Sequence, residues 1–263
     1  MSLAGRIALV SGGGRGIGRA IALGLAADGA DVAINYRRDE ESARATAADI
    51  EKLGRRAVTF PADVGEYEQC VGMVERIGGV MGPVDLLVCN AGVASRGQTV
   101  ADTDPREPDR LWKTHVYSAW ALSKLVLPGM RAAPRGDIIM ISSVATQFLA
   151  PNSAPYNMAK VALEALAVTL AKEERQHGIH VNIVAPGLVD TDMGRRLVKG
   201  AMGVSDIRTM DASSAFGHVC APEEIADAVR FLVSARAAYV TGQRIGVDGG
   251  TCGGGGVGRF LRV

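Results

Sequence analysis

The chain has 263 residues, of which 48% are hydrophobic, and its 29 basic and 28 acidic side chains leave a formal net charge of +1. A chain of this length and composition can bury a large core, and we expect one α/β domain over residues 1–263. The balanced charge excludes the extended basic field by which proteins bind the phosphate backbone of nucleic acids.

The sequence carries neither a run of eighteen apolar residues nor a charged leader before an apolar segment, so we expect no membrane insertion and no secretion. Its cysteines are far apart, without a C-x-x-C pair or a histidine at ligand spacing. We therefore expect no metal site and reduced thiols in a cytoplasmic protein. The cysteines are Cys70, Cys89, Cys220 and Cys252.

Short apolar segments alternate along the chain with amphipathic segments of helix length. Nearly all-apolar strands suit a parallel sheet covered on both faces, and the alternation implies right-handed crossovers. The pattern predicts a doubly wound α/β Rossmann fold with a seven-stranded parallel sheet. In chain order we expect strand 7–10, helix 16–28, strand 32–34, helix 40–53, strand 57–60, helix 66–81, strand 86–89, helix 108–130, strand 138–141, helix 154–176, strand 180–184, helix 222–234 and strand 244–247.

A glycine-rich turn lies between the first strand and the first helix, with Gly12, Gly16 and Gly18 in the run Ser-Gly-Gly-Gly-Arg-Gly-Ile-Gly. Glycine allows a tight turn and a close approach of the backbone to a pyrophosphate, and the helix that follows offers unpaired N–H groups. Because the turn is placed between a strand and a helix, we expect it to bind a dinucleotide, together with Arg15 and Ile17.

The end of the second strand indicates which nicotinamide cofactor is used. An acid there would bind a free ribose 2′-hydroxyl, but the chain has Tyr36 followed by Arg37 and Arg38, with Arg15 available from the glycine turn. Arginine forks suit a 2′-phosphate, so we expect NADPH to be preferred and NAD to remain possible. The alternative is that the two arginines simply begin a solvated loop.

The later half of the chain contains a candidate acid for carbonyl chemistry. Tyr156 and Lys160 stand one helical turn apart, so a helix would place the phenol and the ammonium on one face, where the cation favours the phenolate. Ser143, thirteen residues earlier, follows a strand and offers a second donor to the same oxygen. We expect Tyr156 to be the general acid, although such residues also occur where they only pack, cap or solvate.

Residues 187–217 mix Gly, Asp, Ser and Met without one sustained period, so we expect a mobile lid. The segment follows a strand end, where α/β folds bind ligands, although it could also be a simple surface excursion. The glycine-rich residues at 252–263 are expected to form a flexible tail.

These motifs, in this order, resemble the short-chain dehydrogenase/reductase family from Ile7 to Gly250. The resemblance implies that Asp63 and Val64 lie near the adenine and that Lys160 also binds the nicotinamide ribose. The motifs that carry it are the glycine turn, Asp63-Val64, Asn90-Ala91-Gly92, Ser143, Tyr156 with Lys160, Pro186-Gly187 with Val189 and Thr191, and Tyr239 to Gln243. By this likeness Asn90, Ala91 and Gly92 flank the adenosine ribose, and Pro186, Gly187, Val189 and Thr191 belong to the cofactor site.

One position departs from the family. Alignment places His115 where members usually carry an asparagine that is thought to hold a water linking the lysine to solvent. An imidazole can donate or accept a hydrogen bond but is bulkier and titrates near neutrality. His115 therefore either keeps the relay in altered form, marks a protein that only binds nucleotide, or is an inert helix histidine satisfied by a backbone carbonyl.

Within the family the likeness is strongest to 3-oxoacyl thioester reductases of the acyl-carrier type, with a shared Gly-Gln-x-x-x-Val-Asp-Gly-Gly pattern at 242–250. It implies an NADPH-dependent reductase of an acyl thioester or another small-molecule ketone. A sugar, polyol or steroid dehydrogenase and a non-catalytic nucleotide sensor remain alternatives. An apolar pocket wall, or else ordinary packing, is indicated by Phe148, Leu149, Met193, Leu197, Val198 and Met202.

The resemblance also implies a homotetramer, assembled through the two longest helices and the last strand. The corresponding segments are 108–130, 154–176 and 244–247. Small residues in the second helix, such as Ala162 and Ala165, suit close helix packing but would equally suit contact with the sheet.

Overall fold

The computed structural model describes residues 3–252. Its centre is a seven-stranded sheet in the order β3-β2-β1-β4-β5-β6-β7, and every neighbouring pair is parallel. The strand order reverses between β1 and β4, which is where open α/β sheets bind ligands. The strands are β1 Ile7–Val10, β2 Asp31–Tyr36, β3 Ala57–Pro61, β4 Leu86–Cys89, β5 Gly136–Ile141, β6 Ile179–Pro186 and β7 Arg244–Val247.

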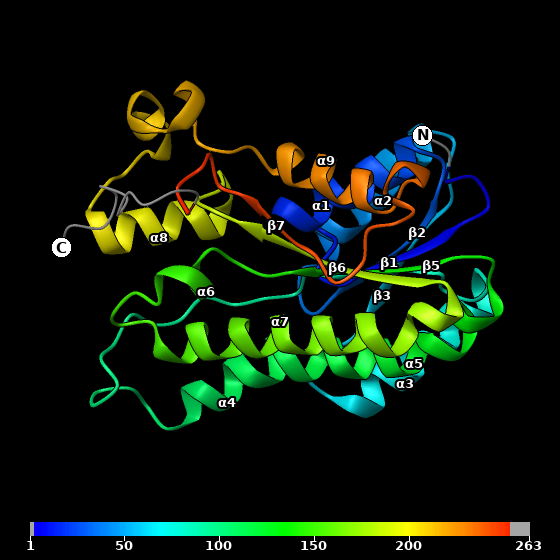
Figure 1. The fold of residues 1–263 in the computed structure, drawn as a ribbon. Helices are drawn as coiled ribbons and strands as arrows, with labels where there is room; N and C mark the ends of the chain where they lie inside the picture. The colour runs from blue at the N-terminus through cyan, green and yellow to red at the C-terminus, as the bar shows by residue number, and fades with distance from the viewer. Residues whose placement is uncertain (1–2, 253–263) are drawn as a thin grey trace.

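Helices cover both faces of this sheet, with α1, α2 and α9 on one side and α3, α4, α5 and α7 on the other (Figure 1). Alternate residues of β1 enter opposite cores: Val10 packs with Leu25 and Val229, whereas Leu9 packs with Met73. The expected doubly wound fold is confirmed. The helices are α1 Gly16–Ala27, α2 Glu40–Lys52, α3 Tyr67–Val80, α4 Arg106–Trp112, α5 Ser118–Ala132, α6 Ala145–Phe148, α7 Ala154–Glu174, α8 Asp192–Met202 and α9 Pro222–Leu232.

The helix expected at 108–130 is not one regular helix. Between α4 and α5 the chain makes a π-helical turn over Lys113–Tyr117, and His115 lies in this turn. The prediction of one continuous α-helix was wrong. A π-helical turn has only one residue more than an α-helical turn would need, so it leaves the hydrophobic pattern of the sequence almost unchanged. Such turns occur frequently at functional sites.

The segment 187–217, which we expect to be a mobile lid, contains regular structure. It contains α8 and two short 3₁₀ helices, Ile207–Ser213 and Ala215–Gly217. Thr191 caps α8 by accepting a hydrogen bond from the Gly194 N–H at 3.1 Å. A small separate core explains the order, because apolar side chains spaced along the segment meet only after it folds. Its buried members are Val198, Ile207, Met210 and Val219.

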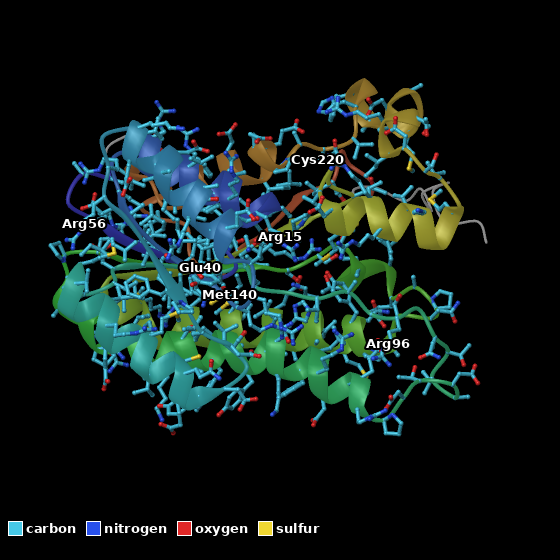
Figure 2. All side chains as sticks on the ribbon, turned by 180° about the vertical axis from the view of Figure 1, so that it is seen from behind. Arg15, Glu40, Arg56, Arg96, Met140 and Cys220 are labelled. Atoms are coloured by element: carbon cyan, nitrogen blue, oxygen red, sulfur yellow. The ribbon has the colours of Figure 1, made fainter. Side chains whose placement is uncertain are left out.

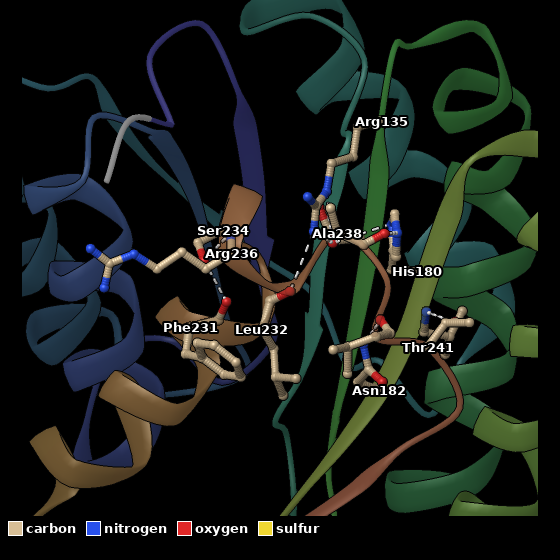
Figure 3. Close-up of polar contacts among 12 residues, drawn as sticks. Arg135, His180, Asn182, Phe231, Leu232, Ser234, Arg236, Ala238 and Thr241 are labelled. Carbon is tan, nitrogen blue, oxygen red and sulfur yellow. Dashed lines mark hydrogen bonds and ion pairs between the residues drawn. The ribbon is translucent and has the colours of Figure 1, made fainter.

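The segment after α9 is fastened to β6 by side chains, as Figure 3 shows. Asn182 donates to the carbonyl of Val240 at 2.9 Å, and the Thr241 hydroxyl accepts from the N–H of Val181 at 3.1 Å. These contacts bring the chain into β7 at the edge of the sheet. The tail expected at 252–263 lies outside the described residues except for Cys252.

Candidate active site

The glycine turn at the carboxyl end of β1 is held from both neighbouring strands. The Ser11 hydroxyl accepts from the N–H groups of Asn90 at 2.9 Å and Ala91 at 3.0 Å. In return, the Asn90 side chain donates to the carbonyls of Ser11 and Gly12 at 2.9 and 3.1 Å. From β2, the Asn35 side chain accepts from the Gly12 N–H at 3.3 Å. Ser11 and Asn35 were not predicted to serve this site, although their positions at strand ends were a usable signal.

The turn has no room for side chains where a dinucleotide would need backbone access. A Cβ at position 18 would lie 2.2 Å from the carbonyl oxygen of Gly12, and one at Gly12 would lie 3.2 Å from the Cα of Ala91. Gly12 and Gly16 also have positive φ angles of 63° and 51°. A Cβ at Gly16 would meet the methyl group of Thr191 at 3.3 Å. The fold thus brings the first glycine turn against the segment that follows β6.

The start of α1 is suited to a phosphate group. Its N-cap residue is Arg15, and no side chain caps the helix, whereas α2 is capped by Asp39 and α8 by Thr191. An uncapped N-terminus leaves N–H groups and a partial positive charge for an anion, and an exposed arginine stands beside them. The residues that are present therefore fit a nicotinamide dinucleotide.

The end of β2 differs in one respect from the expectation. Arg37 lies 3.5 Å from the carboxylate of Asp63, so these two predicted cofactor residues contact each other. Burial and the nearby Glu40 raise the pKa of Tyr36. Glu40 was not predicted here, and its charge is balanced by Arg44 at 2.7 Å. Figure 2 shows Arg15 and Glu40 where α1 and α2 begin.

Ser143, Tyr156 and Lys160 come together beyond the carboxyl end of β5. The amine of Lys160 is buried, donates to the carbonyl of Ile141 at 2.8 Å and lies 5.7 Å from the centroid of the Tyr156 ring. The Ser143 oxygen accepts from the Ala145 N–H at 3.1 Å, and Ser143 is near enough to Tyr156 to lower the pKa of the phenol. Two neighbouring hydroxyls can present two donors to one substrate oxygen.

The direction of the tyrosine pKa is opposite to the expected one. Burial raises the pKa of Tyr156, and the hydrogen bond from Ser143 lowers it only in part. Burial also lowers the pKa of Lys160 to about 7, with Glu164 acting in the opposite sense. The expectation from spacing was wrong here because it considered the charge of the lysine and omitted the desolvation of both groups.

His115 is placed beside these residues by the π-helical turn. Its ring meets the Tyr156 ring edge to face, with 5.4 Å between centroids, and a Cβ at Gly92 would lie 2.7 Å from its Cε1. The Nε2 atom lies 2.8 Å from the carbonyl of Val93, whereas the buried Nδ1 has no hydrogen-bond partner within residues 3–252. Burial lowers the pKa of His115 to about 3. The ring is therefore neutral at physiological pH. The expectation that it titrates near neutrality was wrong.

The remaining predicted cofactor residues divide into three groups. Gly187 lies against Asp248, and Asp63 accepts from the Gly65 N–H at 3.0 Å, so both belong to half-buried turns at the carboxyl edge. Val64 and Val189 are buried in the two cores, which leaves only their backbone for a ligand. Partly exposed Ile17 and buried Pro186 follow β1 and end β6 at the same edge.

Apolar side chains gather on the segments that flank the site. Phe148 and Leu149 at α6 are exposed, as are Met193 and Leu197 of α8 and Met202 at its end. Val198 is different, because it is 2% exposed and belongs to the small core of the 187–217 segment. For Val198 the alternative of ordinary packing therefore holds.

Within residues 3–252, no group of three or more His, Cys, Asp or Glu side chains is arranged to hold a metal ion. In the same residues no helix is both long and apolar enough to cross a membrane.

Comparisons with known proteins agree on one family. Residues 12–252 match the family model described as Enoyl-(Acyl carrier protein) reductase. The chain is 37% identical over 250 residues to the 3-oxoacyl-[acyl-carrier-protein] reductase of Escherichia coli, covering 95% of this chain and 98% of that protein. It is 35% identical over 260 residues to the tetrahydroxynaphthalene reductase of Pyricularia oryzae, covering 95% and 91%.

A solved structure shows the same likeness in three dimensions. L-Sorbose reductase from Gluconobacter frateurii, complexed with NADPH and L-sorbose, superposes with a TM-score of 0.88 at 31% identity, covering 97% of this chain and 99% of that one. The chain belongs to the short-chain dehydrogenase/reductase family of NAD(P)-dependent oxidoreductases.

Proposed function

We propose that this protein reduces a ketone with NADPH, and that Tyr156 is the general acid. The observation that carries the proposal is that Tyr156 and Ser143 come together beside the buried amine of Lys160. They lie at the same edge of the sheet as the uncapped start of α1. Proton donors and a dinucleotide site at one edge suit hydride transfer to a carbonyl.

The chemistry divides between the cofactor and the chain. When bound, NADPH supplies the hydride that reaches the carbonyl carbon. Tyr156 donates its proton to the oxygen on which negative charge grows, and Ser143 donates a second hydrogen bond to that oxygen. Because burial raises the pKa of Tyr156, the phenol stays protonated and is ready to act as an acid. The Lys160 amine lies near the ring, and its positive charge when protonated stabilises the negative charge left on the phenolate.

A spectrophotometric screen tests the proposal. Absorbance at 340 nm is followed with panels of ketones and alcohols, each with NADPH or NADP and with NADH or NAD. Turnover of apolar ketones with NADPH is the expected result. Tight NADPH binding without turnover on any substrate would instead favour the nucleotide sensor.

The substrate we propose is an apolar ketone such as a 3-oxoacyl thioester. Exposed Phe148, Leu149 and Leu197 support it, because they offer apolar surface on both sides of the site. A second candidate is a sugar or polyol, favoured by the structural likeness to a sorbose reductase. The two separate in the screen by their relative kcat/KM.

We expect Arg15 and Arg37 to select NADPH over NADH. Replacing both with alanine removes two charge-assisted hydrogen bonds to the 2′-phosphate, which are worth about 1.5–3 kcal/mol each. The kcat/KM for NADPH should fall about 10²-fold or more, while that for NADH stays near wild type. Arg106→Ala is the control. Like Arg37, this arginine is exposed and pairs with an aspartate, Asp104, but it is not a predicted cofactor residue. Equal losses with both cofactors would contradict the assignment.

We expect His115→Asn to move the alkaline limb of the pH profile for ketone reduction. Lys160 carries its charge below a pKa of about 7 and loses it above, so activity that needs the ammonium falls as pH rises through that value. A smaller amide leaves room for water, and a better hydrated ammonium has a higher pKa. The limb should therefore shift to higher pH. Identical profiles of kcat/KM would remove any relay role for His115.

We also propose a homotetramer in a cytoplasmic, reducing compartment. The four cysteines of the chain are all free, which suits a reducing compartment. Exposed Trp112, Met158 and Val161 on α4 and α7 support assembly through these helices. Analytical sedimentation at micromolar concentration should give four times the monomer mass of 27.4 kDa. A monomer under these conditions would rule the tetramer out.

A further inference from the structure

We propose that the ion pair of Glu164 and Arg244 is a positioning device that fixes the hydroxyl of Ser143. Glu164 lies outside the motifs by which the family is recognised, and Arg244 occupies an unspecified position of the 242–250 pattern. Glu164 is one turn after Lys160 on α7, and Arg244 is the first residue of β7. The effect on reaction rate rests on the proposed function, whereas the effect on the chain can be measured without it.

Three consecutive residues at the end of β5 are each held by a side chain from another element. The carbonyl of Ile141 accepts from Lys160 at 2.8 Å. The Ser142 hydroxyl, which is 4% exposed, donates to Glu164 at 2.7 Å. The carbonyl of Ser143 accepts from Arg244 at 3.4 Å. The backbone on both sides of the Ser143 side chain is therefore tied to α7 and β7.

One carboxylate oxygen is the centre of this arrangement. Besides Ser142, the Oε1 atom of Glu164 accepts from Nε of Arg244 at 3.0 Å, and the Thr146 hydroxyl lies at the same distance. The Thr146 hydroxyl is also 3.0 Å from the carbonyl of Ser143. Thr146 belongs to α6, which lies beside the first turns of α7 (Figure 1). The pair thus joins the end of β5 to α6, α7 and β7.

The partial burial of the pair distinguishes it from a surface ion pair. The Glu164 and Arg244 side chains are 20% and 21% exposed, so their charges are only partly screened by water. Removing one partner leaves the other charge and the Ser142 hydroxyl without their main contact, which costs more than losing an exposed pair. We expect the 142–148 segment to relax in response.

Relaxation of this segment would act directly on the reacting groups. The Ser143 hydroxyl has to point at the same substrate oxygen as Tyr156, and its direction is set by the backbone at 142–144. A displacement of about 1 Å in a catalytic group can cost about 10²-fold in rate. Glu164 and Arg244 touch neither the substrate oxygen nor the cofactor in this proposal, so they are positioning residues.

The test combines kinetics with hydrogen exchange in the full-length protein. Glu164→Ala should lower kcat by about 10- to 100-fold and leave KM for NADPH unchanged. Amide exchange in 142–148 should become faster, because the N–H groups of Ser142 and Val144 donate to Val184 and Pro186 in the ordered segment. Glu164→Gln keeps an acceptor oxygen and should restore most of the rate and of the protection.

A matched control lies ten residues further along α7. Glu174 is 3% exposed and pairs with Arg131 at 2.6 Å, away from the end of β5. Glu174→Ala removes a buried carboxylate from the same helix and should change stability without changing kcat or the exchange of 142–148.

Two results would overturn the proposal. One is wild-type kcat and wild-type exchange at 142–148 in Glu164→Ala. The other is faster exchange spread over the whole sheet to the extent seen in Glu174→Ala. If the wild-type protein turns over no substrate, the proposed function fails, and the local exchange at 142–148 still decides whether the pair holds the segment.

Discussion

Tyr156→Phe is expected to lower kcat for ketone reduction by about 10²- to 10⁴-fold, the usual contribution of a general acid. The substitution removes one hydroxyl and keeps the ring, so the edge contact with His115 should remain. Affinity for NADPH should stay near wild type, because the glycine turn and the start of α1 are unchanged. The measurements are single-turnover absorbance at 340 nm and fluorescence titration of NADPH.

Ser143→Ala is the companion variant for this experiment. It removes the second donor and the hydrogen bond that lowers the pKa of Tyr156, so the phenol becomes a weaker acid. We expect a smaller loss than for Tyr156→Phe. A wild-type kcat in Tyr156→Phe would remove the assigned acid and with it the proposed mechanism.

Gly18→Ala is expected to lower the affinity for NADPH and to destabilise the fold. The added Cβ would lie 2.2 Å from the carbonyl oxygen of Gly12 and 2.5 Å from the side-chain nitrogen of Asn90. Neither atom can move freely, because the Asn90 amide is bonded to the carbonyls of Ser11 and Gly12. The cost of such overpacking is about 1–3 kcal/mol. The displaced turn should lower NADPH affinity more than tenfold.

Gly72→Ala provides the control for this substitution. Gly72 lies within α3, and a Cβ there would meet nothing within 4 Å. Alanine in a helix interior is favoured over glycine by about 0.5–1 kcal/mol, so this variant should be neutral or slightly more stable. Thermal unfolding and NADPH titration compare the two variants. Wild-type affinity in Gly18→Ala would show that the dinucleotide binds elsewhere.

The order of strands and helices could be predicted from the sequence, because the strands are short apolar runs that need burial on both faces of the sheet. β1, β4 and β7 begin and end where the sequence indicated. The sequence did not predict the π-helical turn at Lys113–Tyr117 or helix α8 within the 187–217 segment. In both cases distant contacts decided the local structure, and periodicity carries no record of such contacts.

By itself, the sequence determined the features that depend on near neighbours along the chain. The glycine turn follows β1, and Tyr156 lies one helical turn from Lys160, because local spacing fixes both. Only the tertiary structure decided the protonation of these groups and of His115, since burial by residues far apart in sequence sets the pKa of each. It also decided that Glu164 meets Arg244, 80 residues later, because the parallel sheet places β7 beside β6 and close to the end of β5. Spacing describes one segment at a time, whereas desolvation and long-range ion pairs exist only after the segments pack together.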